Sequence, residues 1–198
     1  MPRIDLTVAA GIFLFSIGLR PQEPCPDARA WTGKYTNHSY GFAITIPDHL
    51  EGFWNSFACV GGPDGCVCMT DHGRIIPLSS KRGEAEPYIE AYGGFAADLD
   101  EPTVSREMDK RLGWIRERSR GGIQVRSRSA ITLAGLEAER AVVRYYDKKL
   151  KSWFIEDFIE ALQGGVEYSL CVRTRDTSYG RDRLVFEAVV QSFVLTDE

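Results

Sequence analysis

Two stretches of the chain repeat apolar residues at the spacing of an amphipathic helix. The first contains Val104, Met108, Leu112 and Ile115, and the second contains Phe186, Val189, Val190 and Phe193. Pro102 precedes the first stretch and Gly121-Gly122 follow it, which indicates where that helix begins and ends. We therefore predict one helix that ends at these glycines and a second over about residues 181–191.

Other segments alternate apolar and polar residues between turn signals, as β-strands do. In the clearest case Phe42, Ile44 and Ile46 share one face, and Pro47 ends the strand. Gly164-Gly165 separate two such runs, over residues 153–162 and 166–172, and predict a hairpin. Further strands are expected at residues 55–60, 67–69, 88–92, 123–128, 130–133 and 136–146. Strands, helix, strands and helix in this order predict an α+β fold with a mainly antiparallel sheet.

The first residues have the pattern of an export signal. Residues 6–19 form an uncharged apolar run of 14 residues, and a membrane-spanning helix needs roughly 20. Arg3 precedes the run and polar residues end it, as in a secretory signal peptide. We expect a signal peptide over 1–18, a linker over 19–34 and one domain over 35–198, in a periplasmic or secreted protein. An uncleaved N-terminal anchor is the alternative.

Composition narrows the class of protein further. The 198 residues are 43% hydrophobic and 26% charged, which fits a globular domain and excludes a disordered or collagenous chain. A net charge of -4 gives none of the basic excess that nucleic-acid-binding domains usually carry. Residues 106–128 nevertheless hold eight basic and three acidic residues. They form either a solvated helix face, supported by pairs such as Glu107 with Arg111, or a surface for anionic glycans, lipids or an acidic partner.

The predicted strand over residues 153–162 places aromatic and acidic residues next to each other. Its aromatic residues are Trp153, Phe154 and Phe158, and its acidic residues are Glu156, Asp157 and Glu160. Burial of alternate positions explains about half of this pattern. An exposed aromatic residue among them would indicate a surface for a protein partner.

Cysteine use agrees with export. The five cysteines are Cys25, Cys59, Cys66, Cys68 and Cys171. In an oxidising compartment the last four predict structural disulfides, for which three connectivities exist. Cys59 and Cys66 flank a turn of glycine, proline and aspartate, so a bridge across that turn is plausible. A second bridge would then join Cys68 to Cys171.

The same segment offers the main alternative chemistry. Cys66, Cys68, Asp71 and His72 lie within seven positions, and their sulfur, oxygen and nitrogen atoms could bind zinc or copper. The Cys66-x-Cys68 pair could also exchange disulfides. The sequence contains no P-loop, no nucleophile elbow, no zinc-protease motif and no dinucleotide-binding glycine pattern. We therefore expect no catalytic residues, no cofactor and no enzymatic activity.

Two motifs resemble those of the PsbP-like superfamily. Residues 35–47 read YTNHSYGFAITIP, and the last predicted helix runs into Ser192-Phe193. The superfamily contains the photosystem II extrinsic subunit P, a Ran-binding nuclear import factor and many exported bacterial proteins. The resemblance implies an α/β/α sandwich with an antiparallel sheet between helices, from which residues 59–72 depart as a cysteine-rich insert. It also implies no shared catalytic residues, and a role in binding or assembling another exported or envelope protein through protein-protein contacts.

Overall fold

The structure is a computed structural model that describes residues 32–37, 40–54, 59–62, 65–68, 73–78, 87–96 and 102–196. The expected signal peptide, most of the expected linker, and Cys25 lie outside these residues. The helices and strands, in chain order, are β1 (Gly33–Asn37), β2 (Phe42–Ile46), β3 (Phe53–Trp54), β4 (Cys59–Gly62), β5 (Gly65–Cys68), β6 (Gly73–Pro77), β7 (Tyr88–Phe95), α1 (Val104–Arg118), β8 (Ser119–Leu133), β9 (Leu136–Asp147), β10 (Ser152–Gln163), β11 (Val166–Arg175), α2 (Tyr179–Ser192) and β12 (Val194–Leu195).

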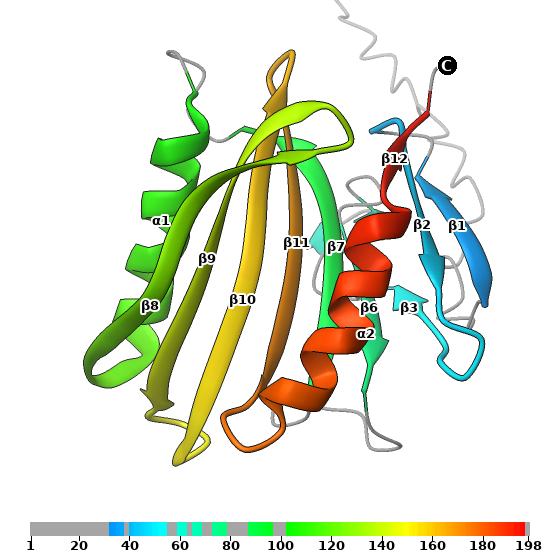
Figure 1. The fold of residues 1–198 in the computed structure, drawn as a ribbon. Coiled ribbons are helices and arrows are strands. Elements are labelled where there is room, and N and C mark those ends of the chain that lie inside the picture. Colours follow the sequence, from blue (N-terminus) through cyan, green and yellow to red (C-terminus); the bar gives the residue numbers. More distant parts are fainter. Residues whose placement is uncertain are drawn as a thin grey trace, which may run out of the picture.

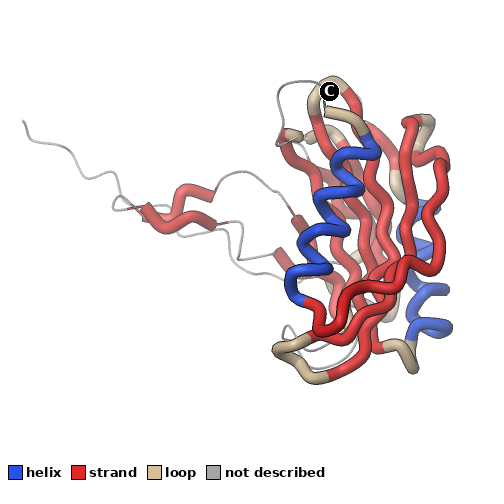
Figure 2. Tube along the Cα trace, turned by 90° about the vertical axis from the view of Figure 1, so that its left-hand side faces the viewer, coloured by secondary structure: helices blue, strands red, loops and turns tan. Residues whose placement is uncertain are grey.

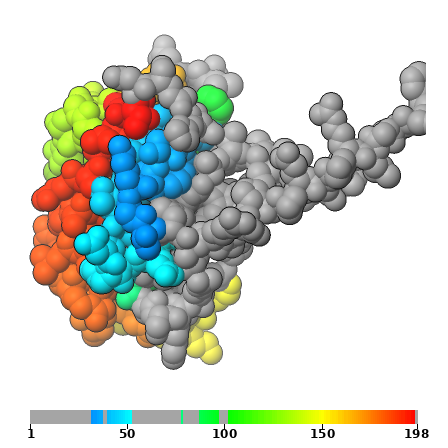
Figure 3. All heavy atoms as spheres, turned by 90° about the vertical axis from the view of Figure 1, so that its right-hand side faces the viewer, coloured from blue at the N-terminus to red at the C-terminus, as the bar shows by residue number. Residues whose placement is uncertain are grey.

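A seven-stranded antiparallel sheet in the order β3-β6-β7-β11-β10-β9-β8 forms the centre of the molecule (Figure 1). Helix α1 packs on one face of this sheet, over β8, β9 and β10. Helix α2 packs on the other face, and seen from the side the strands lie between the two helices (Figure 2). A three-stranded sheet, β1-β2-β12, lies on the side of α2, and in it β2 pairs with β12 of the C-terminal segment (Figure 3). The structure confirms the predicted α+β class and the mainly antiparallel pairing.

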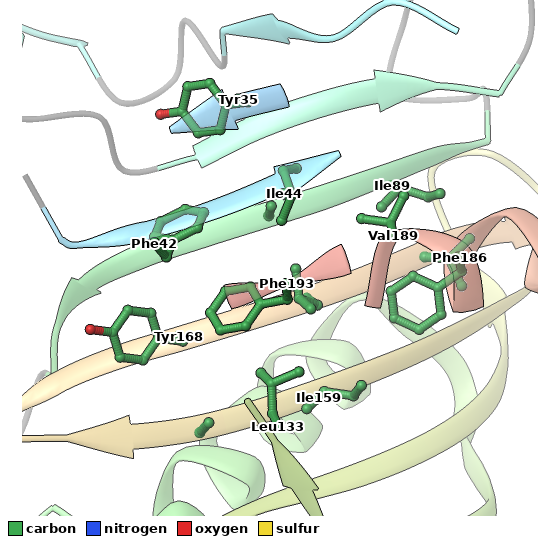
Figure 4. Close-up of a cluster of buried hydrophobic side chains, with 14 of the residues drawn as sticks. Tyr35, Phe42, Ile44, Ile89, Leu133, Ile159, Tyr168, Phe186, Val189 and Phe193 are labelled. Carbon is green, nitrogen blue, oxygen red and sulfur yellow. The ribbon is translucent and has the colours of Figure 1, made fainter. Parts of the chain in front are cut away.

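One hydrophobic cluster fills the space between the sheet, α2 and the small sheet. Phe42 of β2 stacks on Phe193 with ring centroids 5.5 Å apart, and Tyr168 of β11 meets both rings edge-on (Figure 4). Gly93 lies under this group, because a Cβ atom there would come within 2.8 Å of Phe42 and 2.9 Å of Tyr40. Strand β7 continues through Gly93-Gly94, where the sequence had predicted its end. Gly93 allows close packing between the layers.

A second hydrophobic cluster lies under α1. The predicted helix face is confirmed, since Met108, Leu112 and Ile115 are buried against apolar residues of β9, β10 and β11. Thr103 caps the helix by accepting a hydrogen bond from the backbone N–H of Arg106 at 3.3 Å. No helix among the described residues combines the length and the apolar character needed to cross a membrane.

The main difference from the prediction is at Gly121-Gly122. Helix α1 ends earlier, at Arg118, and both glycines lie inside β8 with φ angles of +83° and +89°. Their left-handed backbone coincides with a break in the β8–β9 register between Ser119 and Ile123, as in a β-bulge. The two strands predicted at 123–128 and 130–133 are one continuous strand, because Ser129, which lies between them, pairs with Arg140 of β9.

The remaining predictions are confirmed or shifted by a few residues. The hairpin around Gly164-Gly165 is formed by β10 and β11, and the last helix runs over Tyr179–Ser192. The strands expected at 55–60 and 67–69 are found at Cys59–Gly62 and Gly65–Cys68. Strand β1 begins two residues before the expected domain boundary. Strands β1, β3, β6 and β12, which are five residues long or shorter, were not predicted.

Candidate functional site: an ionic network and a cationic pocket beside helix α1

Strand β10 carries three buried carboxylates, because it lies inside the sheet and is covered on both faces. Asp157 points toward α2, where Arg140 binds both of its oxygens at 2.7 Å and the Tyr179 hydroxyl donates at 2.7 Å. Glu156 and Glu160 point toward α1, as do Phe154 and Phe158 of the cluster under that helix. Because both faces of β10 are buried, polar and apolar residues do not alternate along this strand. The structure therefore places all three acidic residues inside the protein.

Glu156 is the centre of an ionic network under α1. It is fully buried, and it accepts a hydrogen bond from the Tyr145 hydroxyl at 2.6 Å and another from Arg118. Two more guanidinium groups approach it, since Arg173 lies 3.5 Å and Arg111 3.9 Å from its oxygens. Burial by itself would raise the pKa of the Glu156 carboxyl, but the arginines and the tyrosine hydroxyl outweigh burial and lower it. Glu156 is therefore a carboxylate at neutral pH.

Arg173 connects this carboxylate to the end of β9. Its guanidinium donates to the Tyr145 hydroxyl at 3.0 Å and to Asp147 at 2.8 Å, and it lies 4.5 Å from the ring centroid of Phe154. Asp147 also holds the β9–β10 turn, because its other oxygen accepts from the backbone N–H groups of Lys149 at 2.9 Å and Leu150 at 2.8 Å. The network thus sets the conformation of a turn that presents Lys148 and Lys149 to solvent.

A pocket of about 410 Å³ opens where this turn meets the network. It is lined by Tyr88, Arg118, Asp147, Lys148, Lys149, Leu150 and Arg173. Four of these side chains are cationic and one is a carboxylate, so the pocket has an excess of positive charge even when the buried Glu156 is included. A preorganised group of arginine and lysine side chains is suited to hold a carboxylate or phosphate.

The other face of the same hairpin end carries an exposed aromatic group. Trp153, at the start of β10, is 45% exposed. The Arg144 guanidinium lies 3.9 Å from its ring centroid, and Tyr146 meets it edge-on at 5.5 Å. Trp153 is the exposed aromatic residue on this strand that the sequence analysis identified as the sign of a partner surface. We call residues 144–153 the hairpin end.

The buried tyrosine hydroxyls and the buried thiol of this region keep their protons at neutral pH. Burial raises the pKa of the Tyr145 and Tyr88 hydroxyls, and both remain protonated at neutral pH. Cys171 lies on β11 beneath α1, and burial raises the pKa of its thiol. Because little thiolate is present at neutral pH, Cys171 is a poor nucleophile. The arrangement can bind and orient an anionic group.

The basic residues at 106–128 do not form one uniform surface. Arg111 and Arg118 point inward to Glu156, while Arg128 is held on the surface by Asp109 at 2.5 Å and Glu139 at 2.8 Å. Glu107 pairs with Lys110 at 2.9 Å, and not with Arg111 as expected.

The ionic network around Glu156 was not predicted from the sequence, because its members come from α1, β9, β10 and β11, which are far apart in the chain. The only local signal was the run of acidic residues inside an apolar strand.

The cysteine positions differ from the expected bridges. Strands β4 and β5 pair so that Cys59 lies opposite Cys68, while Cys66 lies opposite Gly61. The thiol of Cys171 is free and buried, which differs from the predicted bridge to Cys68. Packing explains this, because Cys171 is in the hydrophobic cluster under α1. Asp71 and His72, the other residues of the alternative metal site, lie outside the described residues. Within the described part of the chain, no three His, Cys, Asp or Glu residues are grouped to hold a metal ion.

Comparison with known proteins supports the fold assignment. No protein-family model and no curated protein matches the chain. Among solved structures it is similar to the cyanobacterial PsbP of Synechocystis, CyanoP, with a TM-score of 0.54 and 13% identity over 89% of this chain and 99% of that one. It is also similar to LpqN of Mycobacterium tuberculosis, which is involved in cell envelope biogenesis, with a TM-score of 0.56 and 14% identity over 86% of this chain and 94% of that one.

A third similar structure is PA94 of Pseudomonas aeruginosa, a protein of unknown function, with a TM-score of 0.53 and 14% identity over 83% of this chain and 97% of that one. At these identities the likeness concerns the fold alone. It agrees with the resemblance carried by residues 35–47 and by Ser192-Phe193. The chain therefore has a PsbP-like fold.

Proposed function

We propose that this protein is an exported, non-catalytic binding or assembly module that contacts a protein partner of the cell envelope through its hairpin end. The observation that carries the proposal is that two features suited to binding occur together at the hairpin end. A cationic pocket lies on one side of the β9–β10 turn, and an exposed tryptophan, flanked by an arginine and a tyrosine, lies on the other. Tryptophan, tyrosine and arginine are the residues that most often dominate the energy of protein-protein contacts.

The charge of the pocket indicates the chemistry of the partner. An acidic side chain or a chain-terminal carboxylate would meet Arg118, Lys148 and Arg173 at the mouth of the network. The overall charge of -4 opposes a nucleic acid as partner. The similar structure of LpqN, a protein involved in cell envelope biogenesis, supports the envelope as the location of the partner.

The protonation states in the site support a non-catalytic role. General acid–base catalysis needs a group whose pKa lies near the working pH. In this site burial moves the pKa of the tyrosines and of Cys171 upward, and the arginines move the pKa of Glu156 downward. Binding is therefore the function that these groups can perform together without a proton transfer.

Capture of the partner from an envelope extract, followed by mass spectrometry, tests the proposal. Lys148→Glu reverses the charge at the pocket, and Trp153→Ala removes the exposed aromatic ring. Each should reduce capture of the same partner more than tenfold, and added salt should weaken capture by the unchanged protein. Matched controls are Lys34→Glu on β1 and Leu184→Ala on α2, since both residues are exposed and lie outside the hairpin end. Equal capture by all four variants would overturn the proposal.

A further inference from the structure

A second pocket, with the opposite chemistry, lies on the other side of the ionic network. It has a volume of about 230 Å³, and four of its lining residues are glutamates contributed by α1, β7, β10 and β11. They are Glu90, Glu107, Glu160 and Glu167. Its two cationic side chains are already engaged, because Lys110 pairs with Glu107 at 2.9 Å and Arg111 lies 3.9 Å from both Glu90 and Glu156.

Glu160 is the unusual residue of this pocket. It is 2% exposed, and its Oε1 atom accepts a hydrogen bond from the Ser169 hydroxyl at 3.0 Å. Its Oε2 atom is buried and has no hydrogen-bond donor among the described residues. Neither Glu160 nor Glu167 forms an ion pair with any residue in the described ranges. The Glu167 carboxyl lies within hydrogen-bond reach of Glu160, so the two side chains can share a proton. When both are ionised, the buried oxygen without a donor is costly, and a ligand that supplies a donor would remove this cost.

The wall of the pocket indicates which donor would fit. Trp114 of α1 lines it and is 60% exposed, so its ring is available to a ligand. Tyr92 of β7 also lines it. Aromatic rings attract alkyl ammonium groups through their π faces and also cover the alkyl chain. The carboxylates are not grouped as metal ligands within the described part of the chain, which favours an organic cation over a metal ion.

We propose that this second pocket binds an alkyl ammonium group, with Glu160 and Glu167 accepting its N–H donors and Trp114 lying against its alkyl chain. The ammonium could belong to a free amine or to a lysine side chain, and the chemistry of recognition is the same. This site is separate from the hairpin end, and it does not depend on the function proposed above.

A proton competes with the ligand for Glu160. Burial, assisted by the charge of Glu167, raises the pKa of Glu160 to about 8, and Arg111 opposes the rise. The charged and titratable groups around it are Glu107, Lys110 and Arg111 on α1, Glu90 and Tyr92 on β7, Glu139 on the neighbouring β9, and Glu167 on β11. Because Glu160 accepts from an ammonium only when it is ionised, the affinity should rise with pH until the amine itself loses its proton.

Calorimetric titration of the purified mature protein provides the test. The probes are n-butylamine hydrochloride and a lysine blocked at both its α-amino and carboxyl groups, and n-butanol is the neutral control. Both ammonium probes should bind at least tenfold more tightly at pH about 9 than at pH about 6.5, and n-butanol should not bind. Tighter binding of n-butylamine would indicate a free amine as the ligand, and tighter binding of the blocked lysine would indicate a protein side chain.

Glu160→Gln should weaken binding at pH about 9 at least tenfold and reduce the pH dependence to the part that comes from Glu167, whose pKa burial also raises. Glu137→Gln, an exposed change of the same kind on β9, should leave both unchanged. Glu167→Gln provides a second test of the pocket if Glu160→Gln does not fold. The proposal fails if neither ammonium probe binds at the higher pH, or if both pocket variants bind like the unchanged protein.

Discussion

Arg173 and Asp147 form an almost fully buried ion pair, with 2.8 Å between the guanidinium and the carboxylate. Arg173 lies on β11 and Asp147 ends β9, so the pair reaches across the intervening strand β10. It joins the ionic network around Glu156 to the turn that carries Lys148 and Lys149. The position of these lysines therefore depends on a residue more than twenty positions away in the chain.

Loss of Asp147 should consequently destabilise the whole domain. Asp147→Ala leaves Arg173 buried without its partner and removes the acceptor for two backbone N–H groups in the turn. We expect a loss of about 3 to 5 kcal/mol in the free energy of unfolding, measured by urea denaturation. The control is Asp176→Ala, whose partners Arg144 and Arg126 are partly exposed. It should cost about 1 kcal/mol or less. Equal losses in the two variants would contradict the importance of the buried pair.

The pH dependence of stability should reveal Glu160. Its pKa rises from 4.5 to about 8 on folding, so the unfolded chain loses this proton at lower pH than the folded protein does. The stabilisation associated with protonated Glu160 is therefore present in full below pH 4.5, declines as the pH rises toward 8 and does not decline further above it. Measured by urea denaturation over this pH range, the free energy of unfolding should decline more steeply with pH for the unchanged protein than for Glu160→Gln. Parallel curves would show that the pKa of Glu160 is not raised.

If the protein is exported to an oxidising compartment, we expect a disulfide between Cys59 and Cys68. The two residues are direct partners across the β4–β5 hairpin, and Cβ atoms of such partners lie close to the separation that a disulfide requires. Cleavage before Asp64 separates Cys59 from the other two cysteines of the hairpin, so a bridge would hold the two fragments together until reduction. The bridge should survive Cys66→Ser and disappear in Cys68→Ser. The reverse result would establish the bridge between Cys59 and Cys66 that the turn sequence suggests.

Cys171 should behave as an inert thiol. It is buried beneath α1, and burial raises its pKa, so the reactive thiolate is scarce at neutral pH. Iodoacetamide should label Cys171 in urea and leave it unlabelled in the native protein, as read by mass spectrometry of the peptide that contains it. Labelling of native protein, or recovery of Cys171 in a disulfide, would contradict this prediction.

Export with removal of the leader remains a prediction of the sequence. N-terminal sequencing of protein from a periplasmic or culture fraction should give a chain that begins after the apolar run of residues 6–19. Recovery of the chain from the cytosol with Met1 intact would contradict it.

The sequence predicted those parts of the fold that depend on local spacing. The buried face of α1, formed by Met108, Leu112 and Ile115, follows directly from helical periodicity. Gly121-Gly122 were interpreted wrongly because a pair of glycines can end a helix or form a bulge, and only the pairing with β9 decides between the two. The network around Glu156 could not be predicted, because its arginines meet the carboxylate only through the register of β9, β10 and β11.

The adjacent carboxylates Glu156 and Asp157 point to opposite faces of β10, and each meets arginine on its own side. A slip of β10 by one residue against its neighbours would turn each carboxylate to the opposite face and away from its partners. Two buried charges would then lie among apolar side chains, at a cost of several kcal/mol for each ion. The charges in the middle of the sheet therefore select a single register among the pairings that the apolar residues of a strand buried on both faces would tolerate.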